Sequence, residues 1–170
     1  MLLLSVASMA LGADEIVTHR VTGLFSPDRE AELRAAVSQI PDVKLVSVDF
    51  QHAEAVFSYD TAVVFKGAKP ESIVERFDGL LRTATHQTMG IAPVDPTPKG
   101  KLALVEIPVA GLDCKACCLA TYESIFKIEG VAAATASFKE GRVTALIDPA
   151  KTNREELEAA LTKRGVTLVK

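Results

Sequence analysis

The stretch Val109-Ala110-Gly111-Leu112 repeats the earlier stretch Val21-Thr22-Gly23-Leu24, with position 21 matching position 109 at an offset of 88 residues. Kept without a gap, this offset aligns further residues with others of the same type: Ile40 with Ile128, Val43 with Val131, Phe50 with Phe138 and Asp60 with Asp148. A shared register over about forty positions is typical of an internal repeat. The sequence therefore predicts two halves that share one fold.

The second half has a pattern of strand, helix, strand, strand, helix, strand. Apolar and polar residues alternate in its strands, and apolar residues recur at helical spacing in its helices. Gly141 allows the tight turn of a hairpin, Thr152 or Asn153 caps the second helix, and Gly165 ends that helix. The predicted elements are a strand at 102–109, a helix at 115–127, a hairpin of 131–138 and 142–147, a helix at 154–163 and a strand at 166–169.

The first half follows the same order, with a few extra residues at 62–66. Its predicted elements lie at 16–21, 27–38, 43–50, 53–59, 70–81 and 86–91. This order is the ferredoxin-like βαββαβ arrangement, in which two helices cover one face of an antiparallel sheet. We therefore predict an α+β protein with two such domains in tandem, at 14–91 and 101–170. A proline-rich linker at 92–100, with Pro93, Pro96 and Pro98, should separate them as a stiff, extended segment.

Composition excludes some classes of function. The chain has 170 residues, a net charge of -3, no Trp and few aromatic residues. A basic face or a base-stacking platform for nucleic acid is therefore not expected. The sequence contains no Ser-His-Asp, paired-carboxylate or phosphate-loop pattern, so we do not expect an enzyme.

Residues 1–13 are apolar and small, and they precede the acidic pair Asp14-Glu15. This pattern resembles the apolar and cleavage regions of a secretory signal, although no Lys or Arg precedes the apolar run. The run is too short to span a bilayer. We expect export to the periplasm or cell envelope; the alternative is a hydrophobic N-terminal strand or anchor.

All three cysteines, Cys114, Cys117 and Cys118, lie within five positions, between a predicted strand and a predicted helix. Residues at i and i+3 share one side of a helix. The free N–H groups and the dipole at a helix N-terminus stabilise a thiolate. Thiolates bind soft ions such as Cu(I), Zn(II) and Hg(II). A Cys-x-x-Cys pair also serves thiol–disulfide exchange, so the loop alone leaves both chemistries open.

The segment Gly111-Leu112-Asp113-Cys114-x-x-Cys117 resembles the Gly-Met-x-Cys-x-x-Cys motif of the heavy-metal-associated domain family. That family includes copper chaperones, the periplasmic mercury-binding protein and N-terminal modules of metal-transporting P-type ATPases. The resemblance covers residues 102–170. It implies a soft metal ion, with Cu(I) favoured and Hg(II) or Zn(II) possible, held by Cys114 and Cys117. It also implies a metal-transporting ATPase or another metal donor or acceptor as partner.

Cys118 is an additional thiol outside that motif. It is either a third ligand, which requires local distortion of the helix, or a small buried residue on its core side.

The first half has no soft ligand at the corresponding loop. Ser26, Arg29 and Glu30 stand where Cys114, Cys117 and Cys118 stand in the second half. Ser26 followed by Pro27 instead predicts an ordinary helix start, with Ser26 as the N-cap. We therefore predict one ion per chain and a first domain that is structural or docks a partner.

The histidines His19, His52 and His86 show no paired ligand spacing and should be surface or packing residues. Two alternatives to metal binding stay open: a thiol–disulfide redox protein, and an interaction module whose metal site is vestigial.

Overall fold

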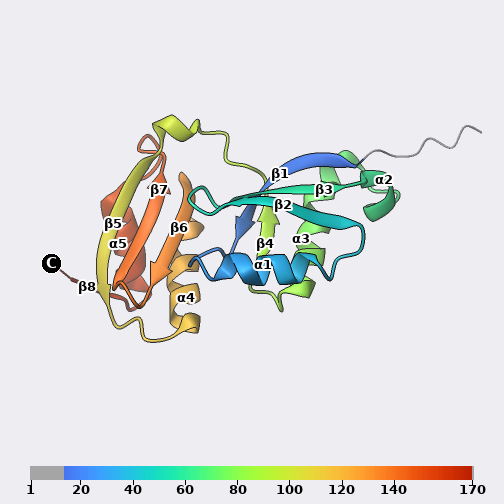
Figure 1. Cartoon of the computed structure of the whole chain (residues 1–170). Helices are drawn as coiled ribbons and strands as arrows, with labels where there is room; N and C mark the ends of the chain where they lie inside the picture. Colours follow the sequence, from blue (N-terminus) through green and yellow to red (C-terminus); the bar gives the residue numbers. More distant parts are fainter. Residues whose placement is uncertain (1–13, 170) are drawn as a thin grey trace, which may run out of the picture.

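The computed structural model describes residues 14–169 of the chain. They form two domains that lie side by side, each with a four-stranded antiparallel sheet (Figure 1). The export signal expected at 1–13 lies outside the described residues. Among residues 14–169, no helix has the length and apolar character needed to cross a membrane.

The first domain has the strand order β2-β3-β1-β4 in its sheet. Its elements are β1 (Glu15–Thr22), α1 (Arg29–Val37), β2 (Val43–Asp49), β3 (Glu54–Tyr59), α2 (Thr61–Val64), the turn η1 (Pro70–Ser72), α3 (Ile73–Ala84) and β4 (Gly90–Ala92). The short α2 accounts for the extra residues that the repeat places at 62–66.

The second domain has the equivalent strand order, β6-β7-β5-β8. Its elements are β5 (Ala103–Ala110), α4 (Lys115–Phe126), β6 (Val131–Ser137), β7 (Arg142–Ile147), α5 (Arg154–Lys163) and β8 (Thr167–Leu168), and a turn, η2 (Lys99–Lys101), precedes them. Both domains therefore have the ferredoxin-like βαββαβ fold, and the predicted fold class is confirmed.

Alternation along the strands creates the cores. In β3, Ala55, Phe57 and Tyr59 are buried while their neighbours are partly exposed. Successive side chains of a strand point to opposite faces, so these three face the helices. Phe77 of α3 packs edge-on against Phe57, with ring centroids 4.9 Å apart. In β7 of the second domain, the alternate residues Val143, Ala145 and Ile147 are buried. They belong to the same hydrophobic core as buried residues of α4 and α5.

The start of α1 differs from its prediction. α1 begins at Arg29, its N-cap residue is Asp28, and no side chain caps it. The Ser26 hydroxyl donates to the Asp28 carboxylate (2.6 Å), and the Ser26 carbonyl accepts from the Arg29 N–H (3.0 Å). The predicted cap at Ser26 is wrong because Ser26 and Pro27 belong to a turn that precedes the helix.

The last strand of the first domain is shorter than predicted. Strand structure was expected at 86–91, but β4 comprises only Gly90–Ala92. His86 and Gln87 have φ values of 50° and 68°. This left-handed backbone conformation forms a turn after α3 and is incompatible with a strand.

The two domains dock through the loop that joins β1 to α1. Phe25 of this loop is buried in the hydrophobic core of the second domain, with its ring centroid 6.1 Å from that of Tyr122. The Phe25 carbonyl accepts from the Ala136 N–H (2.9 Å), and the Gly23 N–H donates to the Tyr122 hydroxyl (2.9 Å). Ala136 belongs to β6, an edge strand, so the loop satisfies a backbone group that would otherwise be open to another chain.

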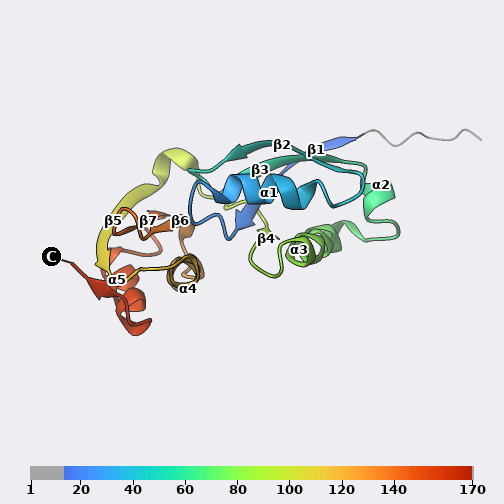
Figure 2. The same ribbon diagram turned by 60° about the horizontal axis from the view of Figure 1, so that its bottom comes forward.

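A second contact lies where β1 ends. The guanidinium group of Arg20 stacks on the Phe126 ring, 3.9 Å from its centroid, and donates to the Val131 carbonyl (2.5 Å). Phe126 is the last residue of α4, which is the second-domain helix nearest the first domain in both Figure 1 and Figure 2. The contact therefore fixes the C-terminal end of this helix against the first domain.

The linker makes polar contacts with both domains. The Thr97 hydroxyl donates to the Asp148 carboxylate of the second domain (3.3 Å). The Lys99 ammonium group pairs with Asp49 (2.9 Å) and Glu54 (2.8 Å) of the first domain. These contacts hold the connecting segment against the two domains that it joins.

Candidate metal centre

The loop between β5 and α4 places a cysteine sulfur at the start of a helix. Cys114 is the N-cap residue of α4, with extended backbone angles (φ −149°, ψ 160°), and its Sγ accepts from the Cys117 N–H (3.1 Å). The first turn of a helix leaves N–H groups without intrahelical acceptors, and its dipole attracts negative charge. A thiolate at Cys114 therefore has a backbone donor already directed at it.

The second sulfur lies beside the first. Cys117 is in the first turn of α4, and the structure joins its Sγ to that of Cys114 as a disulfide, with Cα atoms 5.2 Å apart. Cys114 is exposed and Cys117 is half-buried. Both sulfurs therefore lie on one side of the helix start, as the i and i+3 spacing of the two cysteines favours. On reduction, this geometry offers two adjacent sulfur donors at the protein surface.

The carboxylate of Asp113 lies beside the two sulfurs, and the sequence analysis did not identify it as part of the site. Asp113 Oδ1 lies 3.3 Å from Sγ of Cys117. One donor atom from each of Asp113, Cys114 and Cys117 lies within 4.8 Å of the others, and among residues 14–169 this is the one such group of His, Cys, Asp or Glu. The signal available from the sequence was an acidic residue directly before the first cysteine.

Cys118 lies in a different environment. Its side chain is 1% exposed and belongs to the hydrophobic core of the second domain. Burial raises the pKa of the Cys118 thiol, which favours the protonated form over the thiolate that binds metals. The structure thus places Cys118 on the core side of α4, the packing position that the sequence left open.

The corresponding loop of the first domain holds polar structural contacts. Arg29 stands where Cys117 stands in the repeat, and its side chain is almost completely buried. Its guanidinium group donates to the carbonyl oxygens of Gly23 (3.1 Å) and Thr88 (3.2 Å). In the first domain, the side chain at this position therefore links the loop between β1 and α1 to the turn between α3 and β4.

The three histidines lie apart from the cysteine loop. His19 is buried, with Nε2 2.9 Å from the Tyr59 hydroxyl, and burial lowers the pKa of its imidazole. His52 Nδ1 lies 2.8 Å from the Asp49 carboxylate, and His86 is exposed. None of them belongs to the ligand cluster found among residues 14–169.

The positive charge nearest the cysteines along the chain is that of Lys115, which lies between Cys114 and Cys117. Its Nζ lies 2.6 Å from Oδ2 of Asp28 in the first domain. Hydrogen bonding to this ammonium group lowers the pKa of Asp28 to about 2. The positive charge in the cysteine loop is therefore paired with a carboxylate of the other domain.

No protein-family model matches the chain, and no curated protein matches it. Solved structures similar to one half of it include oxidized MerP from Ralstonia metallidurans CH34, with 28% identity, a TM-score of 0.38, and coverage of 40% of this chain and 94% of that one. Another is the N-terminal domain of a potential copper-translocating P-type ATPase from Bacillus subtilis in the Cu(I)-loaded state, with 31% identity, a TM-score of 0.38, and coverage of 39% and 84%.

A further solved structure matches over most of the chain. The N-terminal soluble domains of Bacillus subtilis CopA share 21% identity with it, at a TM-score of 0.37 and with coverage of 93% of this chain and 94% of that one. The assignment of the fold rests on the strand order and the element order described above.

Proposed function

We propose that this protein binds one soft heavy-metal ion through Cys114 and Cys117 and transfers or sequesters it. The observation that carries the proposal is the pair of adjacent sulfurs at the N-terminus of α4, where the Cys117 N–H is directed at the Cys114 sulfur. Two thiolates in this position select soft ions over Mg²⁺ or Ca²⁺. Cu(I) is the ion that we favour, with Hg(II) and Zn(II) as the alternatives.

The accessibility of the site supports transfer. The loop offers two sulfurs and at most the carboxylate of Asp113, and both Asp113 and Cys114 are exposed. A closed structural zinc site has four protein ligands, whereas an open site leaves room for a ligand from a partner. We propose Cys114 and Cys117 as the ligands and assign Cys118 to packing, because its thiol is buried.

The partner and the location belong to the same proposal. An exposed cysteine loop suits direct ligand exchange with another thiol-bearing protein, and we propose a metal-transporting P-type ATPase or another metal donor or acceptor. The apolar residues 1–13 support export to the periplasm or cell envelope.

A chelator-competition titration tests the proposal. The reduced full chain is titrated with Cu(I), Zn(II) and Hg(II), alongside Cys114→Ser, Cys117→Ser and Cys118→Ala. We expect one tightly bound ion per wild-type chain, loss of tight binding in both serine variants, and retention in Cys118→Ala. If the reduced wild type binds none of the three ions tightly, the proposal is wrong.

The disulfide between Cys114 and Cys117 supports a second candidate function, that of a thiol–disulfide redox protein. In that role the disulfide would accept two electrons and two protons from a dithiol, and the reduced cysteine pair would pass them on to a disulfide substrate. Reductase activity with a disulfide substrate, together with absence of tight metal binding, would favour it over metal transfer.

A further inference from the structure

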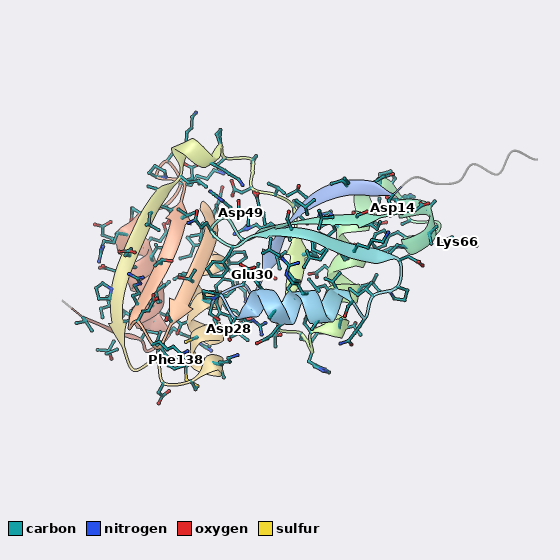
Figure 3. All side chains as sticks on the ribbon, viewed as in Figure 1. Asp14, Asp28, Glu30, Asp49, Lys66 and Phe138 are labelled. Atoms are coloured by element: carbon teal, nitrogen blue, oxygen red, sulfur yellow. A yellow bond between two sulfur atoms is a disulfide. The ribbon has the colours of Figure 1, made fainter. Side chains whose placement is uncertain are left out.

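Lys115, one of the two residues between the proposed ligands Cys114 and Cys117, is held by the other domain. Lys115 Nζ lies 2.6 Å from Asp28 Oδ2 and 3.2 Å from Glu32 Oε1. Figure 3 shows Asp28 at the end of α1 that faces the second domain. Since Lys115 is the first residue of α4 and lies between Cys114 and Cys117, this cluster connects the first domain directly to the proposed metal site.

The two carboxylates are themselves anchored. Asp28 accepts from the Ser26 hydroxyl (2.6 Å), and Glu32 pairs with the guanidinium group of Arg29. Arg29 is only 6% exposed and also donates to the Gly23 carbonyl (3.1 Å). The acceptors for Lys115 are therefore fixed on the first domain by a buried arginine and a turn.

The docking contacts keep this arrangement in place. α4 is held through the Tyr122 hydroxyl, which accepts from the Gly23 N–H, and through the burial of Phe25 in the core of the second domain. The meeting of Lys115 with the two carboxylates thus depends on a packed interface, which limits the freedom of these exposed side chains.

The charge of the bound complex determines how this cluster acts. Two thiols that bind a singly charged ion release two protons and leave a complex with one negative charge. Two thiols that bind a doubly charged ion also release two protons and leave a neutral complex. The Asp113 carboxylate beside the sulfurs adds the same negative charge to both complexes, so a free ammonium group there would stabilise the first complex more than the second. Here that group is bound by carboxylates.

We propose that Asp28 and Glu32 are positioning residues that, by holding Lys115, lower the affinity of the site for singly charged ions relative to doubly charged ions. This inference rests on the proposed metal-binding function. It gives the first domain, which lacks soft ligands of its own at the equivalent loop, a specific role in the metal site of the second. A lowered affinity for Cu(I) favours its release to a partner.

The test measures Cu(I) and Zn(II) affinities of the reduced full chain by chelator competition at about 0.15 M ionic strength, where distant charges are screened. In Asp28→Asn/Glu32→Gln, we expect Cu(I) affinity to rise about two- to fivefold, the size of an exposed ion-pair effect. Zn(II) affinity should change by less than about twofold, because the Zn(II) complex carries one negative charge fewer than the Cu(I) complex. In the Lys115→Met background, the same substitutions should leave Cu(I) affinity nearly unchanged.

Two variants serve as controls. Glu30→Gln neutralises a carboxylate of the same helix that makes no ion pair with any residue at positions 14–169, so it should bind like wild type. Asp28→Glu/Glu32→Asp keeps both charges and should restore wild-type affinity.

Equal gains for both ions, a gain that persists without Lys115, or unchanged affinities would overturn the inference and leave the proposed function standing. Absence of tight binding to the wild type would instead overturn the proposed function.

Discussion

The three cysteines differ in their surroundings although they are nearly adjacent in sequence. Cys114 caps α4 and is exposed, Cys117 lies half-buried beside it, and Cys118 points into the core. Adjacent residues of a helix are about 100° apart around its axis. This angle separates Cys118 from the sulfur pair, because Cys117 is directed to the loop and the next residue is directed to the sheet.

At Cys118 we predict an effect on stability without an effect on metal binding. Cys118→Ser places a hydroxyl at a position that is 1% exposed, and burial of an unpaired hydroxyl should cost about 1–3 kcal/mol of unfolding free energy. Urea denaturation of the reduced protein measures this, with Cys118→Ala as a milder control. A Cys118→Ala variant of wild-type stability that no longer binds metal would show that Cys118 is a ligand.

The two loops that precede α1 and α4 contain matching glycines with a left-handed backbone, but the surroundings of these glycines differ. Gly23 and Gly111, which match in the repeat, have φ values of +87° and +81°. A Cβ on Gly23 would lie 2.1 Å from the Thr88 carbonyl oxygen, whereas no heavy atom lies within 4 Å of a Cβ on Gly111. The first loop is thus enclosed by packed backbone, and the second is open at the protein surface.

This pair of glycines gives a prediction with its own control. Gly111→Ala should cost about 1–2 kcal/mol, because only the left-handed backbone opposes the side chain. Gly23→Ala should cost more, since the backbone at Thr88 must also move, and the nearby docking contact with Tyr122 should weaken. Thermal or urea unfolding of the two variants checks this order. Equal losses would contradict it.

The sequence was sufficient to predict the elements of the second domain. The helix expected at 154–163 is α5, and the hairpin expected around Gly141 is formed by β6 and β7. Alternation and capping determine these elements locally. The start of α1 and the length of β4 were mispredicted because Ser26 bonds to Asp28 and because His86 adopts a left-handed conformation. Neither feature follows from residue type alone.

At the scale of the molecule, the main feature that the sequence did not predict is the docking of the domains. Phe25 has an apolar side chain in a loop, and nothing in its sequence context indicates that it enters the core of the other domain. Likewise, the spacing of Cys114 and Cys117 predicted the sulfur pair, but the contacts of Lys115 with Asp28 and Glu32 join residues that lie far apart in sequence. The repeat predicts similar domains and leaves their contacts undetermined.

We predict that Phe25 stabilises both domains together. Phe25→Ala removes a side chain that is 3% exposed and should reduce the unfolding free energy by about 3–5 kcal/mol. Phe138→Ala, the matched control in the second domain, removes a ring that is 43% exposed and should change it by less than about 0.5 kcal/mol. Urea denaturation measures both. Hydrogen exchange at the Ala136 amide should accelerate in Phe25→Ala, because that amide donates to the Phe25 carbonyl.

If Phe25→Ala were as stable as Phe138→Ala, the first domain would not contribute to the stability of the second. The two domains would then be independent units in solution, and the influence of Asp28 and Glu32 on the metal site would lose its structural basis.

The most direct test of the metal site is X-ray absorption spectroscopy of the reduced full chain with one equivalent of Cu(I). We predict two sulfur atoms bound to the ion in the wild type, the same pair in Cys118→Ala, and loss of the pair in Cys114→Ser/Cys117→Ser. A spectrum with only oxygen or nitrogen neighbours would contradict the assignment of Cys114 and Cys117 as the metal ligands, and three sulfurs that fall to two in Cys118→Ala would contradict the assignment of Cys118 to packing.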